Sequence, residues 1–131
     1  MRKRYLIPAT FAIMLLALMC RQTALPPVVT KKQKNLAIRT IKDYSAVRSA
    51  AVVQEGRNLD LTITVDYATP EENARELGNN FVRLLQTLGP EAMPGAVVGK
   101  GMFNYLVGVF YPSEEMLAMG TKPRTSDRIT W

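Results

Sequence analysis

Residues 59–90 read LDLTITVDYATPEENARELGNNFVRLLQTLGP, and this stretch carries the clearest fold signal in the 131-residue chain. In residues 59–65 apolar and polar side chains alternate. A period of two is typical of a strand with one buried and one solvent-exposed face. The stretch therefore begins with a predicted strand, whose inward side chains are Leu59, Leu61, Ile63 and Val65.

The rest of the stretch predicts an amphipathic helix over residues 70–88. Thr69 precedes Glu72 by three residues, which is the spacing of a capping box, and Pro70 suits the first helical turn. A Gly-Pro pair at residues 89–90 ends the helix. The apolar positions recur with helical spacing and are Ala74, Leu77, Phe81, Leu84, Leu85 and Leu88.

Four further extended segments surround this strand and helix. Residues 47–53 precede the strand and connect to it through a turn-like sequence at residues 55–58. Residues 103–112 follow the helix and are apolar on both faces, which is typical of a central strand. A partner strand is predicted at residues 116–122, and a short closing strand at residues 126–131.

A second helix is predicted at residues 31–44, with Thr30 as its N-cap. The strands on either side of helix 70–88 are expected to be parallel, because a crossover joins them. Gly78, within that helix, is expected to allow close packing on the sheet. The expected architecture is an α+β two-layer sandwich, in which a mixed sheet of about four to five strands carries one or two helices on one face.

The basic charge of the chain belongs to its N-terminal third. The formal net charge is +6. Residues 1–42 hold nine Lys or Arg and no acidic residue, whereas residues 43–131 hold eight basic and eleven acidic residues. A nucleic-acid-binding domain is expected to carry its own basic face, so the distribution argues against nucleic acid as a partner.

The N-terminal residues 1–20 have the layout of an export signal. Arg2, Lys3 and Arg4 form a basic start, and the uncharged, mainly apolar residues 6–19 follow. This run is shorter than the roughly 20 residues that a membrane-spanning helix needs, and it fits the apolar region of a signal peptide.

An apolar run that ends in Cys20, the only cysteine, resembles the lipobox of bacterial lipoproteins. The resemblance implies cleavage before Cys20 and lipid attachment to it, which would tether the protein to an envelope membrane on the extracytoplasmic side. Ala17 and Met19 stand where the family prefers Leu and a small residue, a departure that bears on cleavage more than on membrane targeting. The alternatives are an uncleaved N-terminal anchor, and either a buried structural cysteine or a cleaved, soluble protein.

These signals divide the chain into a leader at residues 1–20, a tether at residues 21–34 and a single small domain at residues 35–131. The lysines of the tether are expected to be solvated, with contact to anionic lipid headgroups as the alternative. They are Lys31, Lys32 and Lys34.

The predicted order of elements over residues 35–111 broadly resembles the small BON-like modules of bacterial envelope lipoproteins. The resemblance is carried by VRSAAVVQEG at residues 47–56 and LTITV at residues 61–65. It implies a non-catalytic module that contacts membranes or an envelope protein partner.

The composition disfavours catalysis. The chain has no histidine, which is the commonest general base and metal ligand. Asp60 and Asp66 are six residues apart on one strand, roughly 20 Å by strand rise, too far to share a proton. Glu71, Glu72 and Glu76 occupy a helix start, where they complement the helix dipole. We therefore expect no enzyme, no metal site and no cofactor.

Aromatic residues of the segment 103–112 are the candidate binding residues. One side of this strand faces the helix, and the other side is an exposed apolar patch or is covered by helix 31–44. The candidates are Phe103, Tyr105, Tyr111 and Phe110.

An alternative function is the binding of a small apolar or lipid-like ligand. The pocket would be lined by Phe81, Met102 and Phe103, and the Gly- and Pro-rich loop 89–102 would act as its lid. Trp131, the last residue, is expected to pack over the sheet edge rather than stand free.

Overall fold

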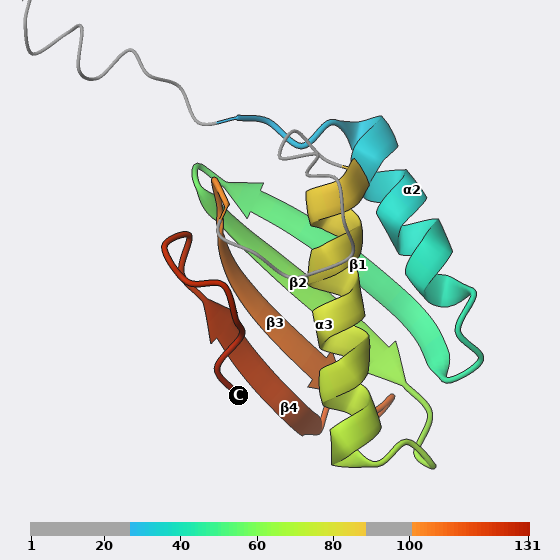
Figure 1. Cartoon of the computed structure of the whole chain (residues 1–131). Coiled ribbons are helices and arrows are strands. Elements are labelled where there is room, and N and C mark those ends of the chain that lie inside the picture. The colour runs from blue at the N-terminus through green and yellow to red at the C-terminus, as the bar shows by residue number, and fades with distance from the viewer. Residues whose placement is uncertain (1–26, 89–100) are drawn as a thin grey trace, which may run out of the picture.

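The computed structural model describes residues 27–88 and 101–131 of the chain. Figure 1 shows two layers, with two helices side by side, in opposite directions, on one face of a sheet. The elements of the described part are α2 (Lys31–Lys42), β1 (Val47–Glu55), β2 (Asn58–Val65), α3 (Glu71–Leu88), β3 (Asn104–Phe110) and β4 (Met116–Lys122). The expected α+β class, a mixed sheet with helices on one face, is confirmed.

The strands form one sheet in the order β1-β2-β3-β4. β1 pairs antiparallel with β2, and β3 pairs antiparallel with β4. Between them β2 and β3 are parallel, with Leu59 opposite Tyr105, so the expected parallel pair around α3 is confirmed. The predicted hairpin turn is also observed, and Gly56 adopts a φ of 61° there, a backbone conformation that glycine accepts without steric cost.

The core lies between the sheet and the helices. The strand alternation predicted for β2 is confirmed, because its four inward side chains are at most 1% exposed. Full burial of an aliphatic or phenyl side chain contributes roughly 1.5–3 kcal/mol. From α3 the core receives the buried side chains of Ala74, Leu77, Phe81, Val82 and Leu85.

The folded part begins before residue 35, the predicted domain start. Val29 is 2% exposed, and its backbone N–H donates to Oε1 of Gln54 at 2.9 Å. Thr30 caps α2 as predicted, in a capping box with Gln33. The last part of the predicted tether is therefore built into the domain, because Val29 fills the core and Thr30 starts the helix.

Helix α3 begins one residue later than predicted, at Glu71. Its first backbone bond runs from the N–H of Ala74 to the carbonyl of Pro70, at 3.0 Å. Pro70 therefore takes the cap position that the sequence assigns to Thr69, and Thr69 is buried.

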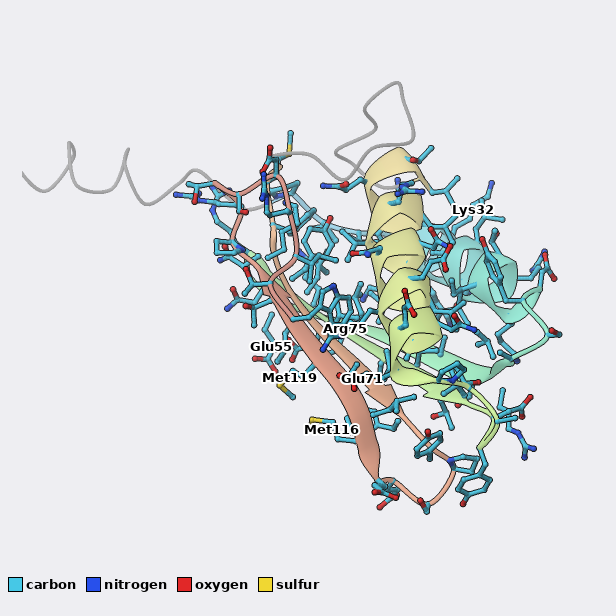
Figure 2. The ribbon with its side chains drawn as sticks, turned by 60° about the horizontal axis from the view of Figure 1, so that its bottom comes forward. Lys32, Glu55, Glu71, Arg75, Met116 and Met119 are labelled. Atoms are coloured by element: carbon cyan, nitrogen blue, oxygen red, sulfur yellow. The ribbon has the colours of Figure 1, made fainter. Side chains whose placement is uncertain are left out.

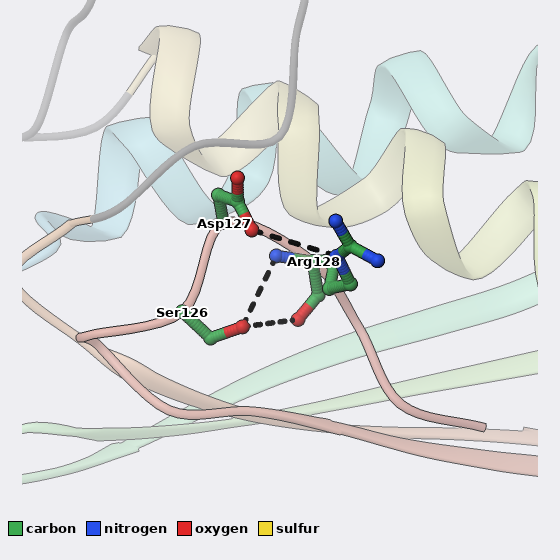
Figure 3. A network of polar contacts seen from close by, with 3 residues as sticks. All are labelled: Ser126, Asp127 and Arg128. Atoms are coloured by element: carbon green, nitrogen blue, oxygen red, sulfur yellow. Dashed lines mark hydrogen bonds and ion pairs between the residues drawn. The ribbon is translucent and has the colours of Figure 1, made fainter.

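The C-terminal segment makes a single bridge rather than the expected closing strand. Thr121 and Thr130 exchange two backbone bonds, of 2.9 and 2.8 Å. Before this bridge, the hydroxyl of Ser126 donates to the carbonyl of Arg128 and accepts from its N–H, while Asp127 lies 3.6 Å from the Arg128 guanidinium (Figure 3). These local contacts turn the chain back towards β4.

Trp131 packs between α3 and β4, which confirms its expected packing. A Cβ added at Gly78 of α3 would lie 2.4 Å from Cη2 of the indole and 3.1 Å from Cγ1 of Val107. A Cβ added at Gly120 of β4 would lie 2.7 Å from Cε3 of the indole. The ring thus fills the space that side chains would need at both glycines, and the expected close packing at Gly78 is confirmed.

Candidate binding surface

The side of the sheet opposite α2 and α3 carries no helix in the described part of the chain, and we call it the open face (Figure 1). Strand register arranges its side chains in rows, such as Asp60, Leu106 and Thr121. The members of the open face are Ser49, Ala51, Val53, Glu55, Asn58, Asp60, Thr62, Thr64, Asn104, Leu106, Gly108, Phe110, Met116, Met119 and Thr121.

Apolar side chains gather on the β3–β4 half of the open face. We define the apolar patch as Leu106, Phe110, Met116 and Met119. Leu106 is 39% exposed, Met116 49% and Met119 44%. Figure 2 shows both methionines projecting from β4 on the side away from α3. Adjoining exposed apolar side chains on one face are typical of an interaction surface.

A bulge brings the two methionines to the same side of β4. Met116 and Met119 are three residues apart, so regular alternation would place them on opposite faces. The register shifts between Val109 and Phe110, so that Val109 lies opposite Ala118 while Phe110 lies opposite Met116. The extra residue restores Met116 to the open face.

The charged strand side chains of the open face are Glu55 and Asp60, both acidic. Arg48, near the start of β1, forms an ion pair with Asp66. Lys122 is buried on the core side, with its ammonium 5.4 Å from the centroid of the Tyr105 ring. The apolar patch therefore adjoins negative charge.

Two hollows adjoin the apolar patch. One, of about 340 Å³, is lined by residues that include Asp60, Asn104 and Leu106. Two hydrogen bonds fix the side chain of Asn104 in this lining. Its side-chain N–H donates to Oδ1 of Asn58 at 3.0 Å, and its Oδ1 accepts from the backbone N–H of Arg124. The other hollow, of about 660 Å³, lies at the opposite end of the strands and is lined by residues that include Thr64, Phe110 and Pro112.

The four aromatic candidates do not share one surface. Phe103 is 1% and Tyr105 3% exposed, so both belong to the core, and their assignment to a binding surface is corrected. Tyr111 is partly buried, and its hydroxyl donates to the carbonyl of Thr69 at 3.1 Å. Phe110 lies on the open face, with its ring against Gly108. Side chains alternate between the two faces along a strand, so Phe110 and Tyr105, five residues apart, lie on opposite faces of the sheet.

The residues proposed for a ligand pocket do not share exposure to solvent. Phe81 and Phe103 are 0% and 1% exposed, so solvent does not reach either in the described structure, whereas Met102 is 45% exposed. Residues 89–100 of the expected lid lie outside the described residues, as does Cys20 with the whole leader.

Among residues 27–88 and 101–131, no three His, Cys, Asp or Glu side chains come together as a metal-binding group. Glu71, at the start of α3, pairs with Arg75 at 2.7 Å. None of the described helices has the length and apolar composition needed to cross a membrane. No family model matches the chain, and no curated protein or solved structure matches it either.

Proposed function

We propose that this chain is an exported protein, tethered to a bacterial envelope membrane through Cys20, whose domain binds another envelope protein through the open face. The apolar patch is the observation that carries the binding role. The basic and apolar leader that ends in Cys20 supports export and tethering. The absence of histidine and the separation of the carboxylates support a binding or assembly role rather than catalysis.

The chemistry of the open face defines the partner. An apolar patch with Asp60 beside it, and Glu55 farther along the same face, is complementary to a surface with apolar side chains and a basic rim. The two hollows beside the patch offer places for anchoring side chains, which carry most of the binding energy in protein interfaces. The proposed partner is therefore an envelope protein with a basic, partly apolar docking surface.

Replacing Cys20 by Ala is expected to abolish lipid attachment, because the thiol is the group that would carry the lipid. The measurement is the intact mass of protein extracted from membranes. The unsubstituted chain should start at Cys20 and carry additional acyl mass, and the Cys20→Ala chain should not. An unmodified full-length chain in the membrane would contradict the lipid tether and indicate an uncleaved N-terminal anchor. Full-length protein in the cytosol would contradict export altogether.

A photo-crosslinking amino acid at Met119 is expected to capture one defined partner in intact cells, and the same probe at Thr87 of α3 is not. Adding Leu106→Glu should reduce the Met119 crosslink about 30-fold, because loss of a central interface residue costs about 2 kcal/mol or more. Thermal unfolding controls for the fold of each variant. Equal capture at both positions, or capture that is insensitive to Leu106→Glu, would contradict binding through the open face.

A further inference from the structure

Helix α2 presents a basic surface on the helical side of the molecule, away from the open face. Ala37 and Ile41 are 0% exposed and turn towards the core. The opposite side of the helix is exposed, and Figure 2 shows Lys32 projecting outward from it. We define the basic stripe by the exposed residues Lys31, Lys32, Asn35, Leu36, Arg39 and Lys42.

The charges of the basic stripe form no ion pair within the described structure, and the acidic residue next to them in the chain is Asp43, the exposed C-cap that follows Lys42. Helix α2 contains no acidic residue, and none of the ion pairs between described residues involves it. The described ion pairs use Arg48, Arg75 and Arg128 instead. Four cations along one helix face therefore form a cationic surface that is available to an anionic one.

Apolar side chains accompany these cations. Leu36, in the middle of the basic stripe, is 41% exposed, and Val28, just before the helix, is 68% exposed. The apolar side of α2 faces the core, so these two side chains supplement an attraction to a membrane that is chiefly electrostatic. The acidic residues Glu71, Glu72 and Glu76 lie at the start of α3, at the end of the helical layer away from Lys32 (Figure 2 labels Glu71).

The position of α2 in the chain brings it close to the proposed tether. Ten residues, 21–30, separate Cys20 from Lys31, so that even a fully extended connection spans about 40 Å at most. A tethered domain therefore keeps the basic stripe at high local concentration above the bilayer. Each lysine or arginine close to an anionic lipid surface raises the membrane-binding constant about fivefold.

We infer that the basic stripe of α2 docks on anionic phospholipid headgroups of the membrane to which the chain is tethered. This inference rests on the proposed tether for the identity of that membrane. Docking through α2 turns the helical layer towards the bilayer and the open face away from it. In this orientation the basic stripe contacts the membrane, while the apolar patch faces away from the membrane and can bind a partner protein.

The test is the partitioning of the full chain between buffer and vesicles of phosphatidylcholine alone or of equal parts phosphatidylcholine and phosphatidylglycerol. The double variant Lys32→Gln, Arg39→Gln removes two charges from the basic stripe, and glutamine has a similar helix propensity. The matched control is Arg124→Gln, Arg128→Gln, which removes two exposed charges from the C-terminal segment. Circular dichroism and thermal unfolding establish that both variants fold.

The stripe variant is expected to lose about 25-fold of its preference for the anionic vesicles at low salt, while the control keeps that preference. High salt should remove the preference of the unsubstituted chain, because it screens exposed charges. Binding to neutral vesicles should be the same for all three chains. Binding to neutral vesicles measures the N-terminal anchoring alone, because these vesicles carry no net charge to attract the basic stripe.

Equal anionic preference of the stripe variant and the unsubstituted chain would overturn the docking of α2 and leave the tether intact. Failure of every chain to bind neutral vesicles would instead contradict the anchoring, and the comparison on anionic vesicles would still decide the basic stripe. Duplex DNA at equal phosphate concentration serves as the competitor. If the chain bound the duplex through the stripe more tightly than it bound anionic vesicles at equal phosphate concentration, the ligand would be nucleic acid and the lipid proposal would fall.

Discussion

Substituting Gly78 by Ala is expected to destabilise the protein, although alanine is the better helix former. The added Cβ would lie 2.4 Å from Cη2 of Trp131 and 3.1 Å from Cγ1 of Val107, closer than packed carbons approach. Overpacking of a core typically costs about 1–3 kcal/mol, whereas the gain in helix propensity is about 1 kcal/mol. The difference leaves an expected fall in the free energy of unfolding of up to about 2 kcal/mol.

The sign of this effect should reverse when the indole is removed. In a Trp131→Ala chain the space beside Gly78 is vacant, so Gly78→Ala should raise the free energy of unfolding by about 0.5–1 kcal/mol through helix propensity alone. Trp131→Ala by itself should lower it by about 2 kcal/mol, because a partly buried aromatic side chain is lost.

Urea unfolding of the four chains measures this double-mutant cycle. The coupling energy between residues 78 and 131 should be about 2 kcal/mol. Gly120→Ala approaches the ring from its other side, where its Cβ would meet Cε3 of Trp131 at 2.7 Å and Cγ2 of Ile129 at 2.5 Å, so Trp131→Ala should relieve only part of its cost. If Gly78→Ala had the same effect with and without the indole, the packing of Trp131 between α3 and β4 would be contradicted.

The second large effect concerns the start of the domain. A chain that begins at residue 27 is expected to match the full chain in thermal unfolding, and a chain that begins at residue 35 is not. The shorter chain lacks Val29, whose burial contributes roughly 1.5–3 kcal/mol, and the Thr30 cap, which contributes about 1 kcal/mol. Loss of the first turn of α2 adds to this, so we expect a total loss of about 3–5 kcal/mol.

The full chain with Val29→Asp is the matched control for this truncation. It keeps every residue but places a charge in the core, so its unfolding midpoint should fall as well, while Val28→Asp, at an exposed position, should leave it unchanged. A chain starting at residue 35 that unfolds at the same temperature as the chain starting at residue 27 would show that residues 27–34 are a spacer after all.

Only part of the candidate site could be predicted from the sequence. Phe110 was among the predicted residues and lies on the open face, but Phe103 and Tyr105 were assigned to a surface and are core residues. A strand that is apolar on both faces does not indicate which face the helices cover. Met116 and Met119 were missed because their spacing predicts opposite faces, and only the bulge opposite Phe110 aligns them.

By itself, the sequence determined the elements that depend on short-range physics. The alternation in β2, the helical spacing in α3, the Thr30 cap and the Gly56 turn all follow from contacts within a few residues, and the structure has each of them. The parallel pairing of the strands around α3 was also predictable, because it depends on the helical crossover that connects them.

The tertiary structure alone decided which side of the sheet is covered and what completes the core. Val29 enters it from a segment with the composition of a spacer, and Trp131 enters it between two glycines that are 42 residues apart in the chain, Gly78 and Gly120. Burial at such positions depends on where distant segments meet. Local periodicity does not predict such contacts. The free energy that stabilises them comes from apolar surface that is removed from water only when the two layers pack together.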